Sequence, residues 1–103
     1  MIEIGEIRGA FLRHEYLFTA HGSDRASRRA IRAREIEEAI AVGEVIEDYP
    51  EDKYGPSCLI LGYTAAQRPL HIQVSYPPQP KIITVYQPSL SDWEADLKTR
   101  RSE

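Results

Sequence analysis

Three potential cations recur at helical spacing in the N-terminal half of the chain. His21, Arg25 and Arg29 are each four residues apart, so a helix would carry them on one face, with Arg28 beside them. Like charges at this spacing repel one another by roughly 0.2–0.5 kcal/mol per pair, so they favour a nearby anion. We interpret this stripe as a candidate phosphate-binding surface. The alternative is pairing within the chain, with the acidic run at residues 44–52.

His71 is a candidate acid–base residue, because an imidazole with an ordinary pKa of about 6.5 exchanges protons near neutrality. Leu70, Ile72 and Val74 alternate with His71 and Gln73, as expected for a strand with one face on the core. His71 then lies on the opposite face, which is either open or covered by the N-terminal helices. The alternative role is a structural hydrogen bond.

Tyr86 is a candidate partner for His71 from the next strand of the chain. Its hydroxyl joins His71 if the proline-rich connection pairs residue 71 with residue 86. A shift of one residue would move the hydroxyl to the other face of the sheet. This part of the site therefore depends on the strand register.

The sequence contains no motif for metal binding, for a phosphate loop or for nucleophilic catalysis. The soft metal ligands, His14, His21, His71 and Cys58, do not occur at the spacings of zinc motifs. There is no glycine-rich phosphate loop and no nucleophile elbow. Cys58 lies between apolar residues and is interpreted as a small core residue. We expect neither a metal nor a cofactor.

Apolar periodicity near 3.6 predicts three helices in the N-terminal half, at residues 2–13, 20–29 and 34–42. Thr19 is placed to cap the second helix through its hydroxyl oxygen. Gly43 follows the last apolar position of the third helix, where a left-handed C-cap residue is expected.

From Glu44 onward the period changes to two and predicts four strands, at residues 44–49, 57–63, 70–76 and 82–86. Short links between them favour an antiparallel meander. The segment Tyr16-Leu17-Phe18 is interpreted as an apolar link. Ser91 is expected to cap a helical turn, from which Trp93 and Leu97 pack back on the domain.

These elements predict an α+β fold, with N-terminal helices packed on one face of a four-stranded antiparallel meander sheet. The length of 103 residues suits one domain over residues 1–103, with a C-terminal tail at 94–103. One cysteine excludes an internal disulfide, and no apolar run approaches the roughly 20 residues that span a bilayer. The N-terminus is acidic where a secretory signal would be basic, so we expect a cytoplasmic protein without membrane contact.

The net charge of −3 conceals a strong segregation. Residues 1–34 carry seven arginines and four acids, residues 35–52 carry eight acids and no base, and residues 53–91 carry three bases and no acid. A dedicated nucleic-acid binder usually has a basic excess, so the total charge disfavours that class. The segregation still leaves room for a local basic patch.

Several segments occur together in a familiar order. They are Phe18-Thr19-Ala20-His21, Arg29-Ala30-Ile31, Gly43-Glu44-Val45-Ile46-Glu47-Asp48-Tyr49-Pro50, Asp52-Lys53-Tyr54-Gly55-Pro56-Ser57-Cys58-Leu59, Arg68-Pro69-Leu70-His71 and Ile83-Thr84-Val85-Tyr86-Gln87-Pro88, followed by Trp93. Over residues 16–93 the chain resembles the family catalogued as domain of unknown function 4258. That family is similar to the RelE/BrnT-type toxins of bacterial toxin–antitoxin pairs.

The resemblance implies a metal-independent ribonuclease or an inactive relative of one. It would make His71 the acid–base residue, Tyr86 a donor, Arg25 and Arg29 phosphate clamps, and His21 either. It also implies RNA and a cognate antitoxin-like protein as partners. The chain departs from such toxins in its acidic net charge and in Ala20, where some related toxins carry lysine.

A second hypothesis is a protein-interaction module without catalysis. It rests on the acidic segment 35–52 and on aromatic residues expected to be exposed at Tyr49 and Tyr54. Dimer formation through a free sheet edge would be compatible with either hypothesis.

Overall fold

The computed structural model describes residues 3–53 and 55–102, and its N-terminal half forms helices as the sequence predicts. Their bounds are Ile4–Leu12 for α1, Ala20–Arg28 for α2 and Ala33–Ala41 for α3. Residue 2, where the first helix was expected to begin, lies outside the described residues. Thr19 caps α2 as predicted, since its Oγ1 accepts a hydrogen bond of 2.9 Å from the Gly22 amide.

The described strands form one five-stranded mixed sheet, so the prediction of a purely antiparallel sheet of four strands is corrected by one further strand that is parallel to its neighbour. The strand order is β1-β5-β4-β3-β2. The four long strands are antiparallel neighbours, as expected for a meander. The strand bounds are Leu17–Phe18 for β1, Glu44–Tyr49 for β2, Ser57–Tyr63 for β3, Pro69–Ser75 for β4 and Lys81–Tyr86 for β5.

The additional strand, β1, is the segment interpreted above as an apolar link. It runs parallel to β5, with Leu17 opposite Lys81. The Leu17 amide donates to the Pro80 carbonyl and the Thr19 amide donates to the Ile82 carbonyl, each at 3.0 Å. Two residues are too few to show the alternation by which a strand is recognised in a sequence.

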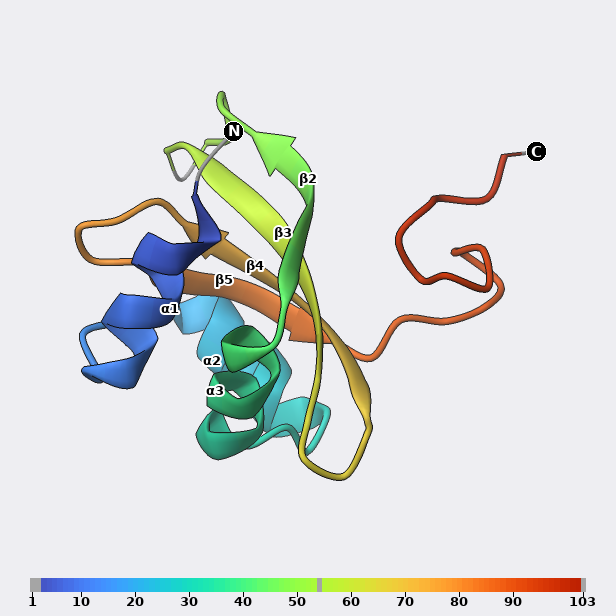
Figure 1. The fold of residues 1–103 in the computed structure, drawn as a ribbon, viewed down its shortest axis with the longest axis horizontal. Helices are drawn as coiled ribbons and strands as arrows, with labels where there is room; N and C mark the ends of the chain where they lie inside the picture. Colours follow the sequence, from blue (N-terminus) through green and yellow to red (C-terminus); the bar gives the residue numbers. More distant parts are fainter. Residues whose placement is uncertain (1–2, 54, 103) are drawn as a thin grey trace.

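The two faces of the sheet are covered by different parts of the chain (Figure 1). Ile60, Ile72 and Val85 are register partners whose side chains belong to the core beneath the helices. That core also includes the buried residues Ile7, Phe11, Ile36, Ala39, Ile40, Cys58, Leu70, Val74 and Ile82. The neighbouring register row, which contains His71, faces the other way because side chains alternate along a strand.

Close backbone approach, and not backbone conformation, explains the glycine at the end of α3. Gly43 was expected to be left-handed, but the one glycine with positive φ among the described residues is Gly55. A Cβ on Gly43 would lie 2.7 Å from Ile60 Cγ2 and 2.9 Å from the Ala39 carbonyl oxygen. A glycine is therefore needed here because the end of α3 lies directly against β3, which leaves no room for a side chain.

The C-terminal segment, residues 88–102, lies on the side of the sheet opposite the helices (Figure 1), and its Leu97 carbonyl contacts His71 on that face. Its one helical turn begins at Ser89 and not at Ser91, because the Trp93 amide donates to the Ser89 carbonyl at 3.0 Å. Trp93 is 2% exposed, so its predicted packing on the domain is confirmed. The expectation that the His71 face is open or covered by the helices is wrong, since this segment covers it.

Candidate active site

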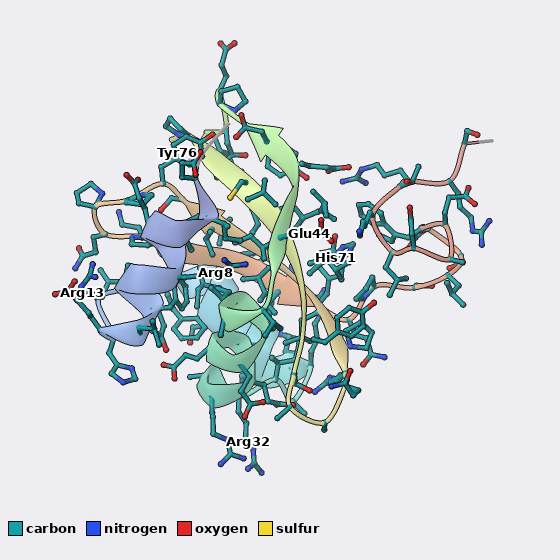
Figure 2. The ribbon with its side chains drawn as sticks, in the orientation of Figure 1. Arg8, Arg13, Arg32, Glu44, His71 and Tyr76 are labelled. Atoms are coloured by element: carbon teal, nitrogen blue, oxygen red, sulfur yellow. The ribbon has the colours of Figure 1, made fainter. Side chains whose placement is uncertain are left out.

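His71 lies on β4, between the sheet and the C-terminal segment, and is completely buried (Figure 2). Its Nε2 is 2.7 Å from the Leu97 carbonyl oxygen, and its Nδ1 is 3.1 Å from the Tyr86 hydroxyl. A carbonyl can only accept, so Nε2 carries the proton and Nδ1 accepts from Tyr86. The indole of Trp93 packs perpendicular to the imidazole, with ring centroids 4.4 Å apart. The imidazole is thus held in one tautomer.

The strand register brings Tyr86 to His71, as the sequence analysis required. His71 and Tyr86 are direct partners across β4 and β5. Arg29 approaches the same place from α2, because its Nη1 donates to the Val85 carbonyl at 2.8 Å. Its guanidinium carbon lies 6.0 Å from the centre of the Tyr86 ring. Of the cationic stripe, Arg29 is therefore the residue that reaches the His71–Tyr86 pair.

The rest of the stripe lies apart from His71, on the helical side of the sheet, where α2 packs against β5. Arg25 donates to the His21 ring at 3.3 Å. Arg28 pairs with Asp24 at 2.9 Å, four residues earlier on the same helix. The alternative prediction, that the stripe pairs with the acidic run at residues 44–52, is therefore wrong for Arg28, because its carboxylate partner lies within α2.

An ion pair that sequence reasoning missed lies beside the histidine. Glu47 on β2 accepts two hydrogen bonds from Arg100, at 2.9 and 3.0 Å, and it also accepts one from the Tyr49 hydroxyl. The Arg100 guanidinium lies 4.6 Å from the centre of the Trp93 ring. A separation of 53 residues along the chain left no periodic signal for this pair.

Burial sets the protonation states of the site. Burial lowers the pKa of His71 below its ordinary value, although the Leu97 carbonyl and Glu47 oppose this effect. Burial also raises the pKa of Tyr86. The pKa of Glu47 is raised by burial but lowered more strongly by its bonds to Arg100 and Tyr49. At neutral pH the site thus holds a neutral imidazole, a neutral phenol and a paired carboxylate.

This burial predicts a pH-dependent stability. The folded protein disfavours the imidazolium of His71, so the unfolded chain binds more protons below pH 6.5. The contribution of neutral His71 to the free energy of unfolding is complete above that pH. It is lost as the pH falls, at up to about 1.4 kcal/mol per pH unit. Urea unfolding between pH 7 and 5 should show the decline, and His71→Gln should flatten it. An equal slope in both proteins would contradict the assignment.

Metal and thiol chemistry have no built site in the described part of the chain. Residues 3–53 and 55–102 contain no group of three or more histidine, cysteine or acidic side chains that could hold a metal. Cys58 is fully buried in the core, as predicted, and burial raises its pKa to about 12. A thiol in this state is a poor nucleophile. Among the same residues, no helix has the length and apolar character to cross a membrane.

The fold and the site together define an α+β protein with a buried histidine bonded to a half-buried tyrosine on the sheet face opposite its helices. Residues 18–87 match the family model described as domain of unknown function (DUF4258), and the chain belongs to this family. No curated protein and no solved structure shows a significant match. The matched region ends at Gln87, directly before the C-terminal segment.

Proposed function

We propose that this chain is a toxin-like domain that binds RNA and cleaves it without a metal ion. The observation that carries the proposal is the hydrogen bond between the Tyr86 hydroxyl and His71 Nδ1. Arg29 donates to the Val85 carbonyl on β5, the strand that carries Tyr86. A neutral imidazole and a phenol can transfer protons at a phosphodiester, and a guanidinium can stabilise the charge that develops on it. The resemblance to RelE/BrnT-type toxins points to the same chemistry.

In such a reaction the ribose 2′-hydroxyl attacks the neighbouring phosphorus and the bond to the 5′-oxygen breaks. A base takes the 2′-hydroxyl proton and an acid protonates the departing oxygen, which leaves a 2′,3′-cyclic phosphate and a 5′-hydroxyl. We assign the proton transfers to His71, with Tyr86 as donor or orienting group. Arg29 would stabilise the charge that develops on the phosphate.

The other cations of α2 would act away from the reacting phosphate. His21, Arg25 and Arg28 lie on the side of α2 that faces away from the sheet, where they suit phosphates further along the same strand of RNA. Such contacts position the nucleic acid without selecting its sequence. An antitoxin-like partner would bind the same surfaces in competition with RNA.

A second candidate function is that of a protein-interaction module, which an exposed apolar surface favours. Leu12, Val42 and Tyr63 are large apolar residues that are 76%, 67% and 40% exposed. Val42 and Tyr63 line a shallow pocket of about 590 Å³ between α3 and β3. Tyr49 does not support this hypothesis, because it is only partly exposed and its hydroxyl donates to Glu47. Tyr54 lies outside the described residues.

The test is cleavage of a labelled single-stranded RNA at low salt in the presence of EDTA. Wild type and His71→Ala are compared side by side, with circular dichroism to verify that the variant is folded. Cleavage by wild type alone, ending in a 2′,3′-cyclic phosphate, supports the proposal. Equal cleavage by both proteins would exclude His71 from the site. Absence of both binding and cleavage would favour the interaction module.

A further inference from the structure

The sheet face beneath the C-terminal segment contains polar side chains that a permanently buried face does not need. His71 and Ser57 are fully buried there, and Gln73 donates to the Ser57 hydroxyl at 3.0 Å. Beside them, Leu59 and Leu61 are buried but lie outside the main core. Buried polar groups require partners and stabilise a fold less than apolar ones do. This composition suits a binding face that is covered part of the time.

The C-terminal segment folds mainly on itself. Trp93 and Arg100 form an isolated antiparallel bridge, and the Glu94 amide donates to the Thr99 carbonyl at 2.8 Å. The Arg101 amide donates to the Asp92 carbonyl at 3.0 Å. These bonds lie within the segment, so they persist if it leaves the sheet as a unit.

Two ion pairs join this unit to β2. Lys98 Nζ lies 2.7 Å from Glu44, with both side chains about half exposed, and Arg100 binds Glu47 through two bonds. Exposed pairs of this kind contribute little and are screened by salt, whereas a bidentate arginine contributes more. The segment is therefore held by the packing of Trp93, by the bond from His71 to Leu97 and by these two ion pairs, and the ion pairs are the part that a polyanion can compete for.

We propose that the C-terminal segment is a displaceable cover over the His71–Tyr86 site, latched by Lys98 and Arg100 to Glu44 and Glu47. A polyanion such as RNA opens the latch by replacing these two carboxylates with phosphates. The cations that hold the cover closed then become phosphate contacts of the open protein. The regulation of an RNA site by this cover rests on the function proposed above. The movement of the segment does not depend on that function.

Three observations indicate that the segment is a movable cover and not a fixed part of the core. The Leu97 carbonyl occupies the ring nitrogen of His71 that a substrate would need. The family match ends at Gln87, so the segment lies beyond the matched domain. Trp93 packs on the imidazole of His71 and is not a member of the core cluster beneath the helices.

Trp93 is the single tryptophan of the chain and reports directly on the cover. Acrylamide quenching of its fluorescence should be compared for wild type and for the full-length latch variant Lys98→Gln/Arg100→Gln. The matched control is Arg13→Gln/Arg34→Gln, which removes the same charge from two arginines outside the C-terminal segment that pair with Glu15 and Glu38. We expect the open fraction to rise about tenfold in the latch variant and to stay unchanged in the control.

Amide hydrogen exchange of β3 and β4 separates opening from unfolding. The cover is supported if Trp93 becomes accessible while these amides remain protected. It is refuted if Trp93 stays shielded in the latch variant, if the control opens equally, or if β3 and β4 lose protection together with Trp93. Each result holds whether or not the protein acts on RNA.

The same variants then test the proposed function by itself. Faster cleavage by the latch variant at saturating RNA would support both the cover and the RNA site, because the loss of Lys98 and Arg100 weakens RNA binding but uncovers His71. An open cover with neither binding nor cleavage would retain the movement and refute the ribonuclease proposal. Cleavage by a protein whose Trp93 stays shielded would refute the cover and would place the cleavage site away from the buried His71.

Discussion

Replacing Tyr86 by phenylalanine is expected to slow RNA cleavage by about 10²-fold or more while the protein stays folded. The substitution removes the hydroxyl that donates to His71 Nδ1 and keeps the ring that packs against the imidazole. A positioned proton donor contributes roughly 10²–10⁴-fold to such reactions, whereas the loss of one neutral hydrogen bond costs about 1 kcal/mol of stability. Single-turnover cleavage rates and urea unfolding measure the two effects separately.

Tyr63→Phe is the matched control for this experiment. Tyr63 is the last residue of β3 and is exposed, so the loss of its hydroxyl should change neither the rate nor the stability measurably. If Tyr86→Phe cleaves RNA as fast as the wild type does, Tyr86 takes no part in proton transfer. If both variants slow cleavage equally, the effect is not specific to the site.

Replacing Gly62 by alanine is expected to destabilise the protein by about 3 kcal/mol. A Cβ at this position would lie 2.0 Å from the carbonyl oxygen of Ala39 on α3, and backbone on both sides would have to move. Overpacking of this kind costs roughly 1–3 kcal/mol and sometimes more. It outweighs the gain of about 0.4–1 kcal/mol that alanine provides by restricting the unfolded chain. The measurement is the urea midpoint at constant m-value.

Gly5→Ala provides the opposite sign in the same assay. Gly5 lies in the first turn of α1, and a Cβ there would meet nothing within 4 Å. Alanine should therefore stabilise the helix by roughly 0.5–1 kcal/mol. A Gly62→Ala protein as stable as the wild type would contradict the packing of α3 on β3, and a destabilised Gly5→Ala would contradict the open surroundings of the first turn of α1.

The long elements of this protein follow from local patterns in its sequence. The alternation from Glu44 to Tyr86 predicts the four antiparallel strands, and two of them, β2 and β3, have the bounds expected from the sequence. Period and capping predict the three helices because both are properties of neighbouring residues. Strand β1 escapes this reasoning, since a two-residue strand has no period and its partner lies more than 60 residues away.

The candidate site divides in the same way. The alternation of β4 by itself placed His71 on the face away from the core, and the register that brings Tyr86 to it was a stated condition. Only the tertiary structure decided what covers that face. Leu97, Trp93 and Arg100 reach it from a segment without regular secondary structure, and no periodic signal connects Arg100 with Glu47.

The sequence by itself therefore determined the helices, the long strands and the orientation of the candidate histidine, because each depends on contacts between near neighbours. The tertiary structure alone decided the parallel strand β1, the separation of Arg29 from the other stripe residues, and the burial of His71 beneath the C-terminal segment. These features depend on single contacts between distant residues, and such contacts leave no repeating pattern in a chain.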